Sequence, residues 1–468
     1  MIEDIRKKMR EIPGMDILLA QDWALPWIGE LGRETVKHVL NGELTRIRRR
    51  MLAGEDADIS VDALKKNFEA LLSREGLPRL RRVINATGVV IHTNLGRSLL
   101  AEEAVAAVVR TAGSYSNLEY DLTRGARGQR NAHVEELLCA LTGAEACLVV
   151  NNNAGAVLLC LAALSRGTEV VVSRGELVEI GGTFRIPDIM ELSGAELVEA
   201  GTTNRTHLKD YAAAISERTS MLLKVHPSNF RMDGFTTAPE RSELAALAHE
   251  RGLLFMEDAG SGLLVDGCAL GLSGECDVRA CIEAGADIVT FSGDKMLGGP
   301  QIGVIAGRRG AVNRLREHPI LRTLRVDKMT LAAFEATMRL YAKGDLDRIP
   351  TLAMLRRTPD AMHAQARRLA AKLRRVTPAR VEVVAVEDAV GGGSYPALPL
   401  SGWGVAVGAH PAGGAGRLQA LLRGQEIPVV CGAREDALVL HVRTITPRDE
   451  ALVVEAFARI GTEGGEDA

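Results

Sequence analysis

Two residues of this chain, Asp258 and Lys295, have the side chains and the surroundings that cofactor chemistry needs. Residues 253–257 (LLFME) precede Asp258, and residues 287–291 (DIVTF) lead into the Ser-Gly-Asp-Lys sequence that ends at Lys295. A lysine amine can bond covalently to the aldehyde of pyridoxal 5'-phosphate (PLP). A carboxylate at the pyridine nitrogen keeps the PLP ring protonated, so that the ring withdraws electrons. We therefore predict that Lys295 carries PLP and that Asp258 binds its ring nitrogen.

The pair is more informative than either residue alone. A single aspartate after an apolar segment often caps a helix, and a single lysine usually lies on the surface. Here both residues follow apolar runs of strand length, and glycines lie beside both. Because ligands bind at the carboxyl ends of parallel strands, we expect both side chains at the same edge of one sheet.

A phosphate-binding turn is expected upstream of this pair. An apolar run ends in three asparagines, and the candidates for the turn are Asn152, Asn153, Ala154 and Gly155. Small residues at a helix N-terminus leave backbone N–H groups free to bind an anion. The simpler alternative is a plain asparagine cap of the following helix. Ser292 is a further candidate for contact with the phosphate.

A third segment end offers ring contacts. Residues 221–225 lead into His-Pro-Ser-Asn, so His226, Ser228 and Asn229 are expected near Asp258. Any of the three could hydrogen-bond the cofactor phenol oxygen or stack on the ring. A structural histidine remains an equal alternative.

The elements that position these residues follow from the spacing of apolar residues. Between residues 83 and 310, short apolar runs alternate with helical stretches. Such alternation predicts an α/β fold with a mostly parallel sheet covered by helices on both faces. The expected strands are at 146–150, 169–173, 221–225, 253–257, 287–291 and 303–306.

The remaining sequence predicts two further domains. Residues 1–80 have apolar residues at helical spacing, which indicates an N-terminal helical domain. Residues 81–345 would form the large PLP-binding domain, and residues 346–468 a small C-terminal α/β domain. A run of arginines at 46–50 is typical of a solvated helix face.

Composition limits the possible functions. The 468 residues carry a formal net charge of −3, which excludes a globally basic nucleic-acid binder. The 7 cysteines are scattered and form no Cys-x-x-Cys pair, so neither a disulfide framework nor a metal site is expected. We find no signal peptide and no apolar run long enough to span a membrane, and we expect a cytoplasmic protein.

Further motifs occur at 85–97 (NATGVVIHTNLGR), 116–121 (SNLEYD), 127–128 (RG), 133–135 (HVE), 173–176 (SRGE), 201–206 (GTTNRT) and 292–301 (SGDKMLGGPQ). Together these motifs resemble those of one enzyme family, the bacterial selenocysteine synthases (L-seryl-tRNA(Sec) selenium transferases). The resemblance covers nearly the whole chain.

The resemblance implies a fold, partners and residue roles. It implies a PLP-dependent enzyme of the aspartate-aminotransferase-like fold (fold type I), assembled as a homodecamer, a ring of dimers. The N-terminal domain is implied to bind the selenocysteine tRNA, so the arginine run could contribute to RNA binding. The PLP lysine of the family corresponds to Lys295, and the arginines that bind the substrate anion correspond to Arg97, Arg322 and Arg325.

The implied reaction converts L-seryl-tRNA(Sec) to L-selenocysteinyl-tRNA(Sec). Water is eliminated from the seryl group, and selenium from selenophosphate adds to the resulting aminoacrylyl group. Lys295 would act as general base. Asp294 would assist proton transfer, pair with an arginine or serve a structural role.

Two alternatives stay open at the level of sequence. A PLP-dependent β-eliminating lyase acting on a free small amino acid or amino-sugar acid would share the lysine motif. A tRNA-binding scaffold without catalytic activity would not need Asp258 and Lys295 together.

Overall fold

The computed structural model describes residues 9–463 except 56–57, 181–183, 273–276 and 396–397. The chain divides into two compact units. The first comprises Met1–Ile84 with Arg423–Pro428, and the second comprises Asn85–Leu422 with Val429–Ala468. The predicted division of the second part at residue 345 stays a prediction.

The first unit is built from helices, as predicted. Their apolar faces form a core of their own, in which Leu40 and Leu44 of one helix meet Leu64, Phe68 and Leu72 of another. The spacing of three and four residues places these side chains on one face of each helix. The helices are α2 (Met15–Leu19), α3 (Ala24–Leu31), α4 (Arg33–Leu52) and α5 (Val61–Glu75).

The second unit contains a seven-stranded sheet in which only β13 runs antiparallel to its neighbours. The mostly parallel sheet is confirmed, and all six predicted strands form it. Its strands, in spatial order, are β5 (Ala146–Val150), β13 (Gly303–Gly307), β12 (Ile288–Ser292), β11 (Leu254–Gly260), β10 (Thr219–Val225), β6 (Glu169–Ser173) and β9 (Glu196–Ala200).

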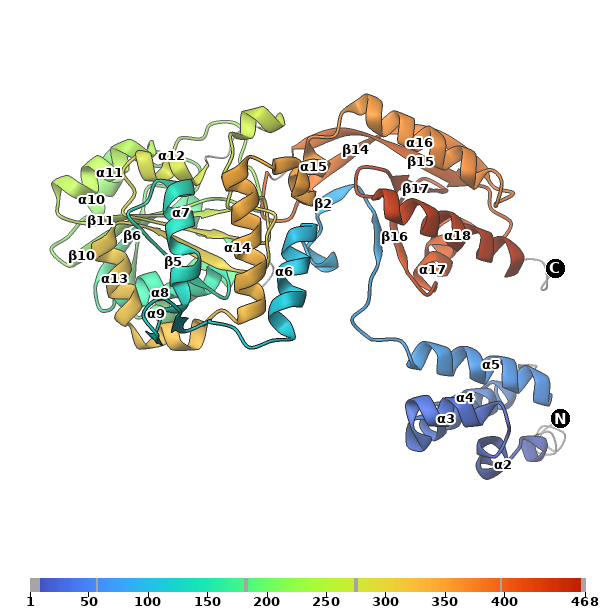
Figure 1. The fold of residues 1–468 in the computed structure, drawn as a ribbon. Coiled ribbons are helices and arrows are strands. Elements are labelled where there is room, and N and C mark those ends of the chain that lie inside the picture. Colours follow the sequence, from blue (N-terminus) through green and yellow to red (C-terminus); the bar gives the residue numbers. More distant parts are fainter. Residues whose placement is uncertain (1–8, 56–57, 181–183, 273–276, 396–397, 464–468) are drawn as a thin grey trace. The chain divides into compact units, whose positions relative to one another are not determined.

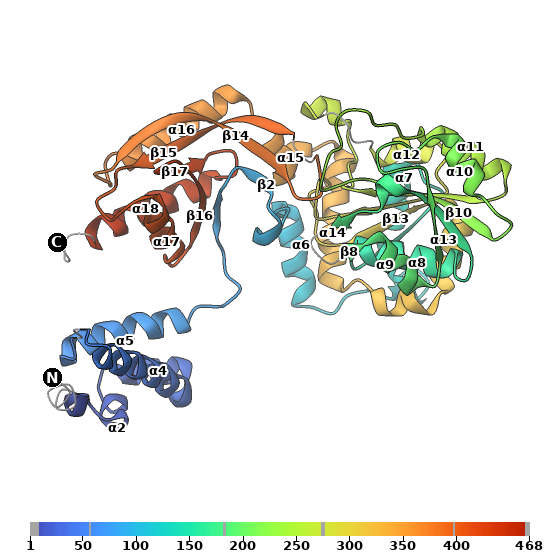
Figure 2. The same ribbon diagram turned by 180° about the vertical axis from the view of Figure 1, so that it is seen from behind.

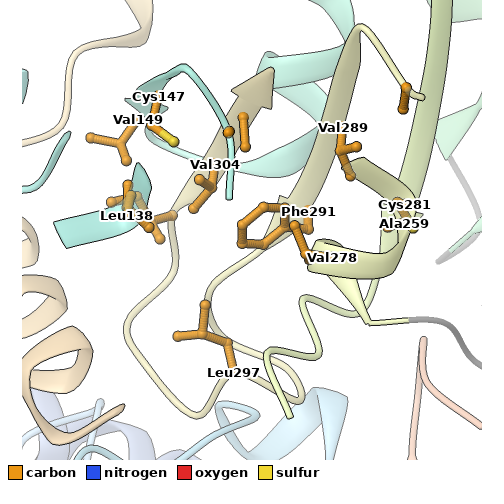
Figure 3. Close-up of a cluster of buried hydrophobic side chains, with 14 of the residues drawn as sticks. Leu138, Cys147, Val149, Ala259, Val278, Cys281, Val289, Phe291, Leu297 and Val304 are labelled. Atoms are coloured by element: carbon orange, nitrogen blue, oxygen red, sulfur yellow. The ribbon is translucent and has the colours of Figure 1, made fainter. Parts of the chain in front are cut away.

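Helices cover both faces of this sheet (Figures 1 and 2). One face carries α7 (Glu135–Thr142), α10 (Leu208–Ala214), α11 (Arg241–Glu250), α12 (Val278–Glu283) and α14 (Lys328–Lys343). The other carries α8 (Asn153–Leu164), α9 (Ile186–Ser193) and α13 (Arg309–Glu317). Figure 3 shows part of the first core, where Val289 and Phe291 of β12 lie among apolar side chains from neighbouring elements.

A second, six-stranded sheet is mostly antiparallel and combines early and late parts of the sequence. The short β2 pairs in parallel with β14, and Ala389 lies opposite Val89. In spatial order the strands are β1 (Ile84–Ala86), β16 (Val429–Arg434), β17 (Ala437–His441), β15 (Pro399–Gly408), β14 (Arg380–Gly391) and β2 (Val89–Ile91). Helix α16 (Pro359–Leu373) packs on β14 and β15, and α17 (Ala415–Arg423) and α18 (Pro447–Glu463) complete the helices of this part.

Short elements connect these layers. They are η1 (Thr93–Leu95), α6 (Glu102–Ala112), β3 (Tyr120–Asp121), β4 (Ala126–Arg127), η2 (Arg130–His133), η3 (Arg174–Glu176), β7 (Glu179–Ile180), β8 (Phe184–Arg185), η4 (Gly267–Leu270), η5 (Pro319–Leu324), η6 (Leu346–Arg348) and α15 (Pro350–Leu355).

Other sequence expectations can be compared with the described residues. None of the six described cysteines forms a disulfide, and Cys276 lies outside the described residues. Among the residues that the structure describes, no three His, Cys, Asp or Glu side chains form a metal-binding group. No helix in the described part of the chain is long and apolar enough to cross a membrane.

Candidate active site

Asp258 lies in the middle of the sheet edge and is almost completely buried. It was expected just beyond its strand, but β11 continues to Gly260 because Asp258 still pairs with Thr290 of β12. Its Oδ1 atom accepts hydrogen bonds from Asn153 Nδ2 at 2.8 Å, Thr290 Oγ1 at 3.2 Å and the backbone N–H of Gly260 at 3.3 Å. Burial raises the pKa of Asp258, and the hydrogen bond from Asn153 and the charge of Lys295 oppose this rise.

Lys295 is 8% exposed and contacts residues of two other segments, Gly393 and Ser98. Its Nζ atom donates to the carbonyl of Gly393 at 3.4 Å, and its own carbonyl accepts from Ser98 Oγ at 2.6 Å. A Cβ atom at Gly393 would lie 2.7 Å from Nζ, and the φ of Gly393 is +84°. Glycine at this position therefore leaves the space that the lysine amine occupies.

Arg97 and Asp294 form an ion pair beside the lysine. Arg97 Nη1 lies 2.7 Å from Asp294 Oδ2, and the Asp294 side chain is 9% exposed. Arg97 has a φ of 63°, which is uncommon for a residue with a side chain. The ion pair and the hydrogen bond from Ser98 to Lys295 fasten the loop around residue 97 to the lysine loop. The structure thus places one of the three implied anion-binding arginines next to Lys295.

The predicted phosphate-binding turn lies at the N-terminus of α8. Asn152 acts as the helix cap, because its Oδ1 accepts from the backbone N–H of Gly155 at 2.8 Å. The Asn153 amide faces Asp258, while Asn153 and Ala154 contribute N–H groups to the first helical turn, where intrahelical acceptors are lacking. Ser292 ends β12 and is buried, and no further role for it is evident from its contacts among the described residues.

Two of the candidate residues after β10, His226 and Asn229, lie in different surroundings. His226 lies beside Asp258, since the backbone N–H of His226 donates to the backbone carbonyl of Asp258 at 3.0 Å. Burial, with the charges of Arg241 and Lys295, lowers the pKa of His226 to about 4, so its imidazole is neutral at pH 7. Asn229 is exposed and donates to the carbonyl of Glu179 at 2.6 Å, away from Asp258.

The two remaining arginines lie on one short helical segment. Arg322 is exposed within η5, and Arg325 caps this 3-10 helix. Arg325 Nη1 lies 3.6 Å from Glu119 Oε1, and this carboxylate also pairs with Arg130 at 2.9 Å. The segment contacts the phosphate-binding turn, because the carbonyl of Leu324 accepts from the N–H of Asn151 at 3.1 Å.

A pocket of about 300 Å³ opens at Arg325 and is rich in guanidinium groups. Arg127, Arg130 and Arg316 line it together with Arg325, and Glu119 is the one carboxylate among its lining residues. This excess of positive charge suits a small anion.

The geometry fits PLP. Among the described residues, the three hydrogen-bond donors to Asp258 all reach Oδ1, so Oδ2 is available to a pyridinium N–H. Lys295 is buried on the adjacent strand end, and a helix N-terminus lies within side-chain reach of Asp258 through Asn153. These are the groups that bind the ring nitrogen, the aldehyde and the phosphate of this cofactor.

Sequence reasoning missed three contributors to the site. Thr290 and Gly393 contact Asp258 and Lys295, and Ser98 fixes the lysine backbone. Thr290 was detectable, because it lies two residues before the Ser-Gly-Asp-Lys turn on the neighbouring strand. Gly393 is 98 residues from Lys295 in the sequence, and its Gly-rich turn gave no indication of its partner.

Similar proteins identify the family of this chain. The family model of L-seryl-tRNA selenium transferase matches residues 83–446, and that of the selenocysteine synthase N terminal matches residues 9–48. The chain is 46% identical over 460 residues to an L-seryl-tRNA(Sec) selenium transferase of Geobacter sulfurreducens, covering 96% of this chain and 99% of that protein. It is 49% identical over 463 residues to the protein of that name from Desulfomicrobium baculatum, covering 96% and 98%.

A solved structure supports the fold class. The structure of a D-glucosaminate-6-phosphate ammonia-lyase is similar to this chain with a TM-score of 0.57 and 22% identity, over 83% of this chain and 97% of that one. At this identity the likeness concerns the fold alone. The predicted fold class, an α/β fold of the aspartate-aminotransferase type with N-terminal helices, is confirmed. From its family models and its full-length relatives, the chain belongs to the L-seryl-tRNA(Sec) selenium transferase family.

Proposed function

We propose that this chain converts L-seryl-tRNA(Sec) to L-selenocysteinyl-tRNA(Sec), with PLP as cofactor and selenophosphate as selenium donor. The observation that carries the proposal is the buried pair Asp258 and Lys295 at one sheet edge, in a chain whose relatives of this name match 96% of its length. The alternative of a β-eliminating lyase is not favoured by these relatives. A scaffold without catalytic activity would not need a buried carboxylate and a buried lysine, which are costly to desolvate.

The roles of the residues follow from their positions. Bound PLP would supply an electron-withdrawing ring that stabilises negative charge at the substrate Cα. Asp258 Oδ2 would accept from the ring N–H, and the first turn of α8 would bind the phosphate. The Lys295 amine would take the Cα proton of the seryl group and return it at the end of the reaction. The neutral His226 beside Asp258 would contact the ring without adding charge.

The arginines would bind the selenium donor. The carboxyl group of serine is esterified in seryl-tRNA, so the anion that needs arginine is selenophosphate. Arg97 lies beside Lys295, and Arg322 and Arg325 flank Leu324, whose carbonyl accepts from the backbone N–H of Asn151. Because Asp294 already pairs with Arg97, the donor would compete with this carboxylate or share the guanidinium, whose fork offers several N–H groups.

The first unit would bind the tRNA through arginines of α4, of which Arg46 and Arg49 are exposed and Arg48 and Arg50 are half-buried. Arg46 pairs with the buried Glu43 through two hydrogen bonds of 2.6 and 2.7 Å, and Arg50 pairs with Glu55 at 2.8 Å. Arg48 and Arg49 are therefore better placed for phosphate contacts. We further propose a cytoplasmic homodecamer, which rests on the resemblance to the family.

The test uses purified protein, PLP and seryl-tRNA(Sec). Addition of selenophosphate is expected to give selenocysteine on the tRNA, and free L-serine is expected to remain unchanged. Turnover of free serine without use of the tRNA would contradict the proposal and support the lyase.

A further inference from the structure

Three hydrogen-bond donors converge on one oxygen of Asp258, and their contributions are unequal. Asn153 Nδ2 is nearest to Oδ1 at 2.8 Å, while the Thr290 hydroxyl and the Gly260 N–H are at 3.2 and 3.3 Å. Two of the donors come from strands of the sheet itself. Asn153 reaches the carboxylate from helix α8, 105 residues away in the sequence.

The orientation of the Asn153 amide is determined by this contact. Its Nδ2 faces Asp258, and its Oδ1 is buried without a hydrogen-bond partner among the described residues. A flipped amide would place its oxygen against the carboxylate, so that two acceptors would face each other. A buried acceptor without a donor is unfavourable, and the contact with Asp258 offsets this cost.

The adjacent residues Asn152 and Asn153 have different roles at the N-terminus of α8. Asn152 caps α8 by accepting from the N–H of Gly155. The side chain of Asn153 is therefore not needed to begin the helix, and it points to Asp258 instead. This position also places the carboxylate near the positive end of the α8 dipole, which favours a negative charge.

Burial and hydrogen bonding act in opposite directions on Asp258. Burial raises the pKa of its carboxyl group, and among the opposing effects the hydrogen bond from Asn153 is larger than the charge of Lys295. Loss of the Asn153 amide would therefore leave a carboxylate that is desolvated and less well held.

We propose that Asn153 is a positioning residue, whose amide keeps the Asp258 carboxylate charged and directs Oδ2 toward the ring nitrogen of bound PLP. The side chain of Asn153 thereby acts at the ring end of the cofactor and not as a ligand of its phosphate. The proposal rests on the proposed cofactor and is independent of the tRNA substrate and the selenium donor.

The experiment measures binding of three probes to the full-length chain and to Asn153→Ala. The probes are PLP, pyridoxal, which lacks the phosphate, and the 1-deaza analogue of PLP, which has carbon in place of the ring nitrogen. We expect Asn153→Ala to weaken PLP and pyridoxal by the same factor, about tenfold. Binding of the deaza analogue should change little, because it offers no N–H to Asp258.

Matched variants make the result specific. Thr290→Val removes the longer of the two side-chain hydrogen bonds to the same oxygen, and it should weaken PLP less than Asn153→Ala does. Asn153→Asp has the same shape and puts two carboxylates together. It should bind PLP more weakly than Asn153→Ala at neutral pH and recover at lower pH, when one shared proton restores a donor. This variant also tests the proposal if Asn153→Ala does not fold.

Each other outcome would overturn the proposal. Loss for PLP but not for pyridoxal would make Asn153 a phosphate ligand. Equal loss for the deaza analogue would indicate packing only, as would an Asn153→Asp variant without pH-dependent recovery. If the unsubstituted chain bound no PLP, both the proposed cofactor and this proposal would be wrong. If it bound PLP but did not use seryl-tRNA, only the proposed function would be wrong.

Discussion

The edge of the large sheet and helix α4 of the first unit both carry charged residues with a proposed functional role. The charged residues differ in burial between the two regions. At the sheet edge, Asp258, Asp294 and Lys295 are each at most 8% exposed as whole residues, and each is held by neighbouring groups. On α4, the Arg46 side chain is 59% exposed and that of Arg50 is 42% exposed. Buried, oriented charges stabilise a reacting group strongly, whereas exposed charges attract a polyanion in small, additive and salt-sensitive steps.

The largest effect is expected at the sheet edge. Lys295→Ala should abolish the visible absorbance of the lysine-bound cofactor. It should also lower turnover by about 10²- to 10⁴-fold, the usual contribution of a general base. Binding of the tRNA to the same variant should be nearly unchanged. A variant that kept both the absorbance and the turnover would disprove the role of Lys295.

A core substitution tests whether the two regions are independent. Phe68 is fully buried in the first unit and stacks on Trp23 at a centroid distance of 5.9 Å. Phe68→Ala should destabilise that unit by about 3–5 kcal/mol. Tracked by calorimetry and by cofactor absorbance, the first unit should unfold earlier while the cofactor band persists. Simultaneous loss of both signals would show that the two regions unfold together.

A graded effect is expected on α4. Replacement of Arg48 and Arg49 by alanine should weaken tRNA binding and reduce the slope of log affinity against log salt by about one per arginine. The matched pair Arg46→Ala and Arg50→Ala should reduce it less, because these arginines already pair with Glu43 and Glu55. Equal slopes for both pairs would argue against this assignment.

The smallest effect concerns pH. The pKa of His226 is lowered to about 4, so the group stays neutral above about pH 5 and contributes no charge change near neutrality. Imidazole NMR signals of the full chain should show no titration of His226 between about pH 6 and pH 8. A transition within that range would show that the imidazole is better solvated than its burial indicates.

The extent to which the site could be predicted depends on how local its signals are. Buried parallel strands are continuous apolar runs, so β5, β10, β11 and β12 and the residues at their ends could be identified directly. The strand β15 was missed because its sequence contains several glycines and a serine, which are poor strand formers. The strand β9 was missed because it has two glutamates among five residues.

Long-range pairs limited the prediction of the site itself. The hydrogen bond from Asn153 to Asp258 and the approach of Gly393 to Lys295 depend on tertiary packing. No spacing in the sequence specifies either of them. Asn152 was proposed as a phosphate ligand with a helix cap as the alternative, and its side chain forms the cap.

The antiparallel strand β13 has a consequence for how the protein folds. In the described chain, β5 lies at the sheet edge and pairs only with β13, so Val150 meets Gly303. During synthesis on the ribosome, β5 therefore cannot pair with a neighbouring strand until residues beyond Lys295 have been made. Pairing between strands so distant in the sequence is slow. We therefore expect the turn at Asn152 and the lysine loop to become ordered together, after β13 has been synthesised. A nascent chain that ends before residue 303 should expose β5 to chaperones and should be unable to capture PLP.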